Sequence, residues 1–130
     1  MPKTYYLSNA LINHALRSPV GSAYARPSGI FVGLFTSPPS VLGGGTEIVG
    51  NGYLRQAISL TAPVNGSSSN GIEITFPLST APWGMPTHFG IFDAVSGGNL
   101  LYWDVLSAPT NVATGKQIVF KANQLAVVET

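Results

Sequence analysis

The stretch GIFVGLFT at residues 29–36 decides the fold class of this 130-residue chain. It is apolar at nearly every position, which is typical of a strand that is buried on both faces. The sequence SPP at 37–39 ends the run, since proline cannot donate a hydrogen bond to a neighbouring strand. Farther along, THFGIFD at 87–93 is followed by the turn sequence SGGN at 96–99. Residues 87–106 therefore predict a β-hairpin.

Three further regions alternate between apolar and polar residues, as half-buried strands do. They are residues 53–61, residues 72–76, and a closing strand pair at 116–121 and 124–129. Their inward-facing residues are expected to be Leu54, Ile58 and Leu60, then Ile72, Ile74 and Phe76, and finally Ile118, Phe120, Leu125 and Val127.

These seven or eight strands, separated by turn sequences, predict an all-β fold: a jelly roll or β-sandwich of antiparallel strands. The chain length is close to that of one domain, so residues 1–130 are expected to form a single unit. Residues 1–28 would be an N-terminal arm and helix, and residues 29–130 would contain the strands.

One short helix is predicted near the start of the chain. Leu7, Leu11 and His14 are spaced so that they share one helix face. Ser8 is the expected N-cap, and the helix should stop before Pro19, because the residue preceding a proline is disfavoured in the α conformation.

The composition is poor in ionisable residues. Asp, Glu, Lys and Arg make up 8% of the chain, against about 25% in a typical soluble domain. A surface of Ser, Thr, Asn, Gly and short apolar side chains costs little to desolvate. This favours a subunit whose surface is covered in an assembly, and the alternative is a small neutral secreted domain.

Charge and hydropathy argue against two classes of partner. The net charge is +1 and the six basic residues are scattered, whereas nucleic-acid binding needs a clustered basic face. No apolar run approaches the roughly 20 residues of a membrane span. The N-terminus MPKTYYLSNAL lacks the apolar stretch of a secretory signal, so we expect synthesis in a cytoplasm and use without processing.

No catalytic, cofactor or metal site is predicted. His14 and His88 form no metal-binding pair, the chain has no cysteine, and no serine lies in a nucleophile-elbow sequence. One enzymatic alternative remains, a hydrolase of cell-wall sugars that uses Asp93 and Asp104. It requires the hairpin to bring the two carboxylates to about 5–9.5 Å.

A second alternative concerns the aromatic residues. Trp83 and Trp103, with Asp104 beside the latter, have the side-chain types of a sugar-binding site, in which a ring stacks on a pyranose. Tryptophan in a small sandwich more often anchors a core or an interface.

Several motifs in fixed order resemble a known family. They are the strand ending in TSPP (36–39), the sequence GNGYLRQ (50–56) after Glu47, the strand ITFP (74–77), and WGMPTHFGIFDAVSGGNLLY (83–102). In this order they are similar to a family of small tailed-phage virion proteins, the tail-fibre-like proteins of the gp80 type. The resemblance covers nearly the whole chain and implies a virion component without catalytic residues.

The resulting hypothesis is a structural protein of the phage virion. We favour a head decoration (cement) protein that forms a homo-oligomer and bridges major capsid proteins, and the alternative is a tail, fibre or baseplate subunit that contacts host glycan. The contact segments are expected to be residues 1–17 and 41–52. The candidate interface residues in them are Tyr5, Tyr6, Leu7, Leu11, Glu47 and Ile48.

Overall fold

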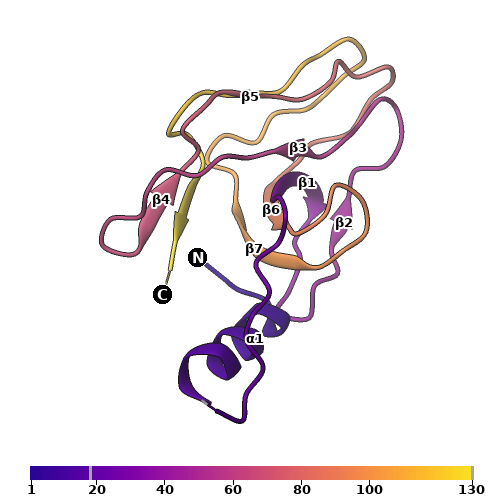
Figure 1. Cartoon of the computed structure of the whole chain (residues 1–130). Helices are drawn as coiled ribbons and strands as arrows, with labels where there is room; N and C mark the ends of the chain where they lie inside the picture. Colours follow the sequence, from indigo (N-terminus) through magenta and orange to yellow (C-terminus); the bar gives the residue numbers. More distant parts are fainter. Residues whose placement is uncertain (18, 130) are drawn as a thin grey trace.

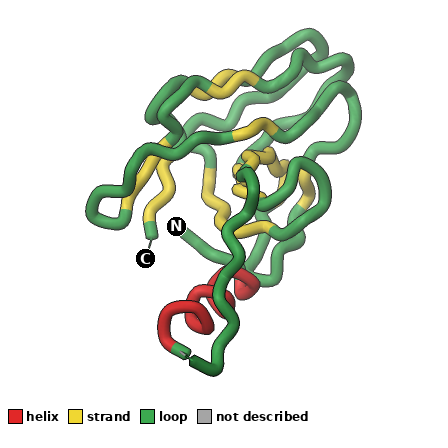
Figure 2. Tube along the Cα trace, in the orientation of Figure 1, coloured by secondary structure: helices red, strands yellow, loops and turns green. Residues whose placement is uncertain are grey.

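The structure, a computed structural model, describes residues 1–17 and 19–129. Within them lie one helix and nine short strands, and loops and turns make up most of the trace (Figure 2). The elements are α1 (Tyr5–Leu16), β1 (Phe31–Ser37), β2 (Thr46–Glu47), β3 (Gln56–Ala57), β4 (Ser67–Ser69), β5 (Ile74–Thr75), β6 (His88–Phe92), β7 (Leu100–Val105), β8 (Val119–Phe120) and β9 (Ala126–Val128). The predicted class, antiparallel all-β with one short N-terminal helix, is confirmed.

The main sheet is built around β1, as its continuous apolar sequence predicts. Its order is β2-β1-β6-β7. β2 and β3 pair with the same edge of β1, β3 near the start of β1 and β2 near its end. β1 and β6 are antiparallel over their length, with Leu34 opposite Phe89. β6 and β7 form the predicted hairpin, with Gly90 opposite Trp103.

The predicted closing strand pair is wrong. β8 pairs with β5, and β9 pairs with β4, so the last two strands belong to two separate two-stranded ribbons. The side chain of the fully buried Asn70 binds the backbone on both sides of the turn that separates β8 from β9. Its Nδ2 donates to the carbonyl of Lys121 at 2.9 Å, and its Oδ1 accepts from the backbone N–H of Leu125 at 2.9 Å. Gln124 N–H donates to the carbonyl of Lys121 at 3.1 Å, so the chain does turn here, but the strands on the two sides of the turn pair with different partners.

The main core lies between one face of the sheet and the two ribbons. Val32 and Leu34 of β1 and Phe89 and Ile91 of β6 point to this side. The cluster is completed by buried residues from the rest of the chain, namely Ile48, Ile58, Ile74, Phe76, Trp83, Leu106, Val112, Phe120 and Leu125.

The predicted alternation of inward and outward side chains in residues 53–61 and 72–76 is only partly present. Ile58, Ile74 and Phe76 are buried as predicted, but Leu54, Leu60 and Ile72 are exposed. Strand pairing covers only Gln56–Ala57 and Ile74–Thr75. Beyond these short strands the backbone is no longer held in the pleat that would direct every second side chain inward.

The opposite face of the sheet carries a smaller aromatic cluster of Phe35, Phe92, Leu100 and Trp103. Phe35 and Phe92 stack with ring centroids 5.8 Å apart. Phe35 and Leu100 lie over Gly90, where an added Cβ would stand 2.7 Å from Phe35 Cε1 and 2.6 Å from Leu100 Cδ1. A glycine at this position lets these two large side chains approach the backbone.

The N-terminal arm extends the sheet beyond β7. Thr4 N–H donates to the carbonyl of Leu101 at 3.0 Å, and Trp103 N–H donates to the carbonyl of Pro2 at 3.2 Å. The buried Thr4, not Ser8, is the N-cap of α1, since its hydroxyl accepts from Leu7 N–H. The same hydroxyl donates to the carbonyl of Leu100 at 2.6 Å, so α1 begins at a point anchored on β7.

Candidate interaction surface

The structure brings the two predicted contact segments side by side. Tyr5 N–H, at the start of α1, donates to the carbonyl of Val41 at 2.8 Å. The loop at 40–43 is closed by reciprocal backbone hydrogen bonds between Ser40 and Gly43. Between helix and loop lies an open hollow of about 380 Å³, which we name the helix–loop hollow. It is lined by Thr4, Tyr5, Tyr6, Val41, Leu42, Gly43, Gly44, Phe92, Gly98, Asn99 and Leu100.

The helix–loop hollow is exposed, apolar in part and free of formal charge. Its rim carries Tyr5, Tyr6 and Leu42, which are 55%, 46% and 84% exposed, and its lining includes no Asp, Glu, Lys or Arg. Large exposed apolar side chains next to one another are typical of interaction sites.

The candidate interface residues divide between surface and interior. Tyr5 and Tyr6 are exposed. Leu7 and Ile48 are buried, and Leu11 is half-buried on the side of α1 that faces the body. Glu47 is also half-buried and bonded within the chain, as described next. Contact with a partner through any of these six residues stays a prediction.

Glu47 belongs to a network with two residues of the sequence GNGYLRQ at 50–56. Arg55 binds its carboxylate in two places, with Nε 2.8 Å from Oε2 and Nη2 2.8 Å from Oε1. The hydroxyl of Tyr53 donates to Oε2 at 2.6 Å and accepts from Leu34 N–H of β1. Burial, and then the bond to Glu47, raises the pKa of Tyr53 well above its ordinary value, so the phenol keeps its proton and remains a donor.

Arg55 also holds the turn between β6 and β7. Its Nη1 donates to the carbonyls of Ala94 and Gly97 at 2.9 and 2.8 Å, and its guanidinium lies 3.4 Å from the ring centroid of Phe92. Space for this network exists because residue 33 is glycine: a Cβ there would stand 2.6 Å from Glu47 Oε2. We refer to Glu47, Tyr53 and Arg55 as the Arg55 clamp. It fixes the 94–97 turn, whose next residues, Gly98 and Asn99, line the helix–loop hollow.

Tyr53 and Arg55 are not among the candidate site residues that the sequence predicts. A signal was present, because positions 53 and 55 are two apart and share one face of an extended segment, with an acidic residue shortly before them.

The arm that positions α1 is tied to the other end of the described chain. Lys3 Nζ forms an ion pair with Glu129, and the Tyr102 hydroxyl donates to the same carboxylate. Partial burial raises the pKa of Glu129, but the hydrogen bonds from Lys3 and Tyr102 outweigh burial and lower the pKa below its ordinary value of 4.5. The charged carboxylate is therefore favoured in the folded state.

Acid is expected to weaken this tie. Because the pKa of Glu129 is lower in the folded than in the unfolded chain, its contribution to stability is present above about pH 4.5 and is lost as pH falls through the folded value. Thermal unfolding at stepped pH should show Glu129→Gln less stable than wild type near pH 7 and the difference shrinking toward about pH 3. Lys3→Gln should follow the same trend. A difference that stays constant across this range would refute the assignment.

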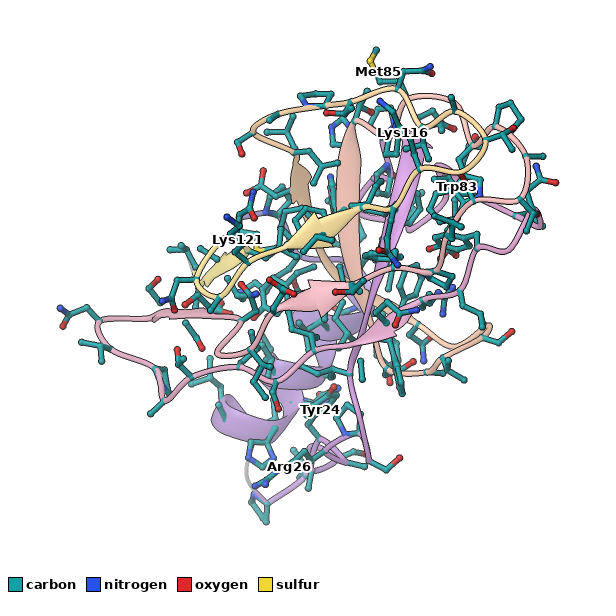
Figure 3. The ribbon with its side chains drawn as sticks, turned by 90° about the horizontal axis from the view of Figure 1, so that it is seen from above. Tyr24, Arg26, Trp83, Met85, Lys116 and Lys121 are labelled. Atoms are coloured by element: carbon teal, nitrogen blue, oxygen red, sulfur yellow. The ribbon has the colours of Figure 1, made fainter. Side chains whose placement is uncertain are left out.

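The two tryptophans lie in the interior. Trp83 is 6% exposed, and its Nε1 donates to the carbonyl of Asn51 at 2.8 Å (Figure 3). Trp103 is 9% exposed and packs in the smaller aromatic cluster, while Asp104 caps the adjacent backbone N–H of Val105. Neither indole presents a ring face on which a sugar could stack, so their positions offer no support for the predicted glycan contact.

The two carboxylates that the enzymatic alternative requires lie far apart. Asp104 is opposite Phe89 near the start of β6, whereas Asp93 follows the end of that strand. Four residues of extended chain separate these levels by about 13 Å, beyond the spacing that glycoside hydrolysis uses. Asp93 instead accepts two hydrogen bonds from Asn99 in the hairpin turn. His88 begins β6, at the opposite end of the strand from Asp93, and its side chain is hydrogen-bonded to the hydroxyl of Thr87.

Residues 1–17 and 19–129 contain no cluster of three or more His, Asp or Glu side chains that could hold a metal ion. Over the same residues, no helix is long and apolar enough to cross a membrane.

Comparison with known proteins identifies the family. No curated protein matches the chain. Residues 2–128 match the family model Gp80, described as Podophage GP4 fiber I protein gp80, which confirms the resemblance seen in the motifs. The match includes the Arg55 clamp, the hairpin of β6 and β7 and both ribbons. The chain therefore belongs to this family of podophage fibre proteins and is a structural protein of the phage virion.

Proposed function

We propose that the chain is a non-enzymatic subunit of the phage fibre apparatus that is held in the particle by protein contacts at the helix–loop hollow. The observation that carries this proposal is the convergence of Tyr5, Tyr6 and Leu42 on one exposed, uncharged surface. The family description is that of a fibre protein, and it favours a position in the fibre over the position on the head that we expected from the sequence.

The rigid backing of this surface supports the same role. The buried Thr4 anchors one wall of the hollow to β7, and the Arg55 clamp fixes the turn that leads into the opposite wall. A surface that is ordered before binding loses less conformational entropy on association. Major capsid proteins are the partners in the head decoration alternative, and fibre or tail proteins are the partners in the proposed one.

The experiment is to locate the protein on intact particles by electron microscopy. An epitope tag inserted between Asn65 and Gly66 lies in the exposed turn before β4, well separated from α1 (Figure 1). Insertions at such turns are tolerated. Gold-labelled antibody should mark the fibres at the tail.

Label over the head would overturn the fibre position and favour the decoration role, and label on free protein alone would overturn the virion role. The variant Tyr6→Glu with Leu42→Glu places two charges in the hollow and should reduce incorporation about tenfold or more, because each charge must be desolvated in the contact. The matched control, Val64→Glu with Ile72→Glu, changes two residues elsewhere whose mean exposure is similar, and it should be incorporated normally.

A further inference from the structure

We propose that Asn65 is a site of spontaneous covalent modification, at which the side-chain amide is converted to aspartate and isoaspartate by the adjoining backbone and water. The inference goes beyond the proposed function, and it does not depend on where the chain lies in the particle. A protein of the virion is not renewed after assembly, so a slow reaction of this kind accumulates with the age of the particle.

The reaction needs an asparagine that is followed by a residue with an accessible backbone nitrogen. The nitrogen of Gly66 attacks Cγ of Asn65, so an N–Cγ bond forms, the Cγ–Nδ2 bond breaks, and the Gly66 N–H proton leaves with Nδ2 as ammonia. Water then opens the cyclic imide. Attack of water on Cγ gives aspartate, and attack on the backbone carbonyl carbon of residue 65 gives isoaspartate. Glycine favours the first step, since it has no side chain to shield its nitrogen.

The chain contains the dipeptide Asn-Gly three times, at 51–52, 65–66 and 70–71. The three sites share both reacting residues and differ in the contacts that folding gives them. They therefore measure, within one molecule, how the structure permits or prevents the reaction.

The site at Asn65 is open. Asn65 and Gly66 have φ angles of 52° and 76° and are the central residues of a two-residue hairpin turn, which backbone hydrogen bonds between Val64 and Ser67 close at 2.9 and 3.0 Å. Both central residues are exposed, and Figure 1 shows the turn before β4 projecting from the body. Among the described residues, neither the Asn65 side chain nor Gly66 N–H has a hydrogen-bond partner. The amide and the attacking nitrogen are therefore free to meet.

The site at Asn70 is closed. Asn70 is 0% exposed, and its side chain is held by the carbonyls of Ile72 and Lys121 and by Leu125 N–H. The attacking nitrogen is also occupied, because Gly71 N–H donates to the carbonyl of Ser59 at 2.9 Å. Reaction at Asn70 therefore requires local unfolding.

The site at Asn51 is intermediate. Asn51 is exposed, but its Nδ2 donates to the carbonyl of Pro82 at 3.3 Å. Its own carbonyl accepts hydrogen bonds from Trp83 Nε1 and from Thr80 N–H, at 2.8 and 3.0 Å. These bonds fasten the turn to residues 80–83, so its backbone rotates less freely than that of the turn at Asn65.

Modification at Asn65 changes both charge and geometry. Either product adds one negative charge, which lowers the formal net charge of the chain from +1 to zero. Isoaspartate also inserts Cβ into the main chain, and the lengthened turn no longer matches the twist of its two strands. The Gly66 carbonyl accepts from Glu129 N–H at 2.7 Å, so the disturbance reaches the residue that ties the N-terminal arm through Lys3 and Tyr102.

Mass spectrometry of the stored full chain tests the proposal. The protein is kept at physiological temperature and mildly alkaline pH, and samples taken over weeks are digested with trypsin. No Lys or Arg lies between Arg55 and Lys116, so Asn65 and Asn70 fall in one peptide, and its fragment ions assign each exchange. Asn65 should convert at least about 100-fold faster than Asn70 and about tenfold faster than Asn51, since these two react only after local opening. Equal rates at Asn65 and Asn70, or formation of aspartate without isoaspartate, would overturn the proposal.

The same measurement in concentrated urea is the matched control. Unfolding removes the hydrogen bonds that protect Asn51 and Asn70, so all three sites should then convert at similar rates. A ranking that persists in the unfolded chain would show that the fold does not set it and would overturn the proposal.

Two variants test the site and its effect on the ribbon of β4 and β9. Asn65→Gly removes the reacting amide and keeps the turn, since glycine adopts a positive φ without strain, and total isoaspartate in the stored protein should fall at least about tenfold. Asn65→Asp carries the charge without the added backbone atom. Amide hydrogens of Ser67 and Glu129 should exchange at least about tenfold faster in stored wild type enriched in isoaspartate than in Asn65→Asp. Unchanged isoaspartate in Asn65→Gly would overturn the site, and equal exchange would overturn the loosening of the ribbon.

Discussion

Replacing Arg55 with methionine is expected to lower the free energy of unfolding by about 3 kcal/mol, because Glu47 is left largely buried without its partner. The side chains of Arg55 and Glu47 are only 9% and 20% exposed. The change also removes two hydrogen bonds to the 94–97 turn and the contact of the guanidinium with Phe92. Urea denaturation followed by tryptophan fluorescence measures the loss.

Two companion variants separate the causes. Arg55→Lys keeps the positive charge but cannot bind the carboxylate at two points and the turn carbonyls together, so it should recover only part of the loss. The double variant Glu47→Gln with Arg55→Met should cost clearly less than the sum of the two single changes, since neither then leaves a charge unpaired. Additive costs would show that the two side chains are not coupled and would contradict the clamp.

Replacing Phe76 with alanine is expected to destabilise the fold by about 4 kcal/mol, which is typical of removing a fully buried aromatic ring. Phe76 is 0% exposed and contacts aromatic rings on both sides: Tyr53 of the clamp, with centroids 6.1 Å apart, and Phe120 of β8, also at 6.1 Å. Its loss leaves a cavity where the β5–β8 ribbon packs on the sheet.

Ile72→Ala is the matched control, four residues earlier in the same segment. Because Ile72 is 67% exposed, its truncation should change the free energy of unfolding by less than about 0.5 kcal/mol. Equal effects at the two positions would contradict the structure and restore the simple alternation that placed both residues inward. Chemical denaturation of the three proteins under one condition decides between these outcomes.

The strongest strands were predictable because their signals are local. The run GIFVGLFT is apolar throughout and ends at a proline pair, and it forms the central strand β1. The turn sequence SGGN connects neighbours in sequence, so the hairpin of β6 and β7 followed directly. Each signal specifies a strand or a turn without reference to distant parts of the chain.

The ribbons could not be predicted in the same way. The partner of β9 is β4, nearly sixty residues earlier, and an alternating pattern does not state which distant strand completes it. The decisive residue, Asn70, looked like ordinary turn material beside Asn65 and the serines. It is instead fully buried and bonds to three backbone groups, an arrangement that depends on the complete tertiary fold.

The candidate surface was partly predictable for a related reason. Two adjacent tyrosines and a long glycine-rich loop are noticeable in the sequence, and the structure places the tyrosines in the first turn of α1, in contact with this loop. Burial is a property of the whole fold, however, so the sequence could not show that Trp83 and Trp103 point inward.

The pairing of Pro2–Thr4 with β7 also bears on how the protein avoids uncontrolled polymerisation. An unprotected edge strand offers a row of N–H and C=O groups on which any other chain can add a strand. Here the arm occupies Leu101 and Trp103 from within the same molecule. A chain without these few residues would expose the edge of β7, and other chains could then pair with it through backbone hydrogen bonds that do not depend on side-chain identity. The arm thus leaves side-chain surfaces to decide which molecules join and in what order.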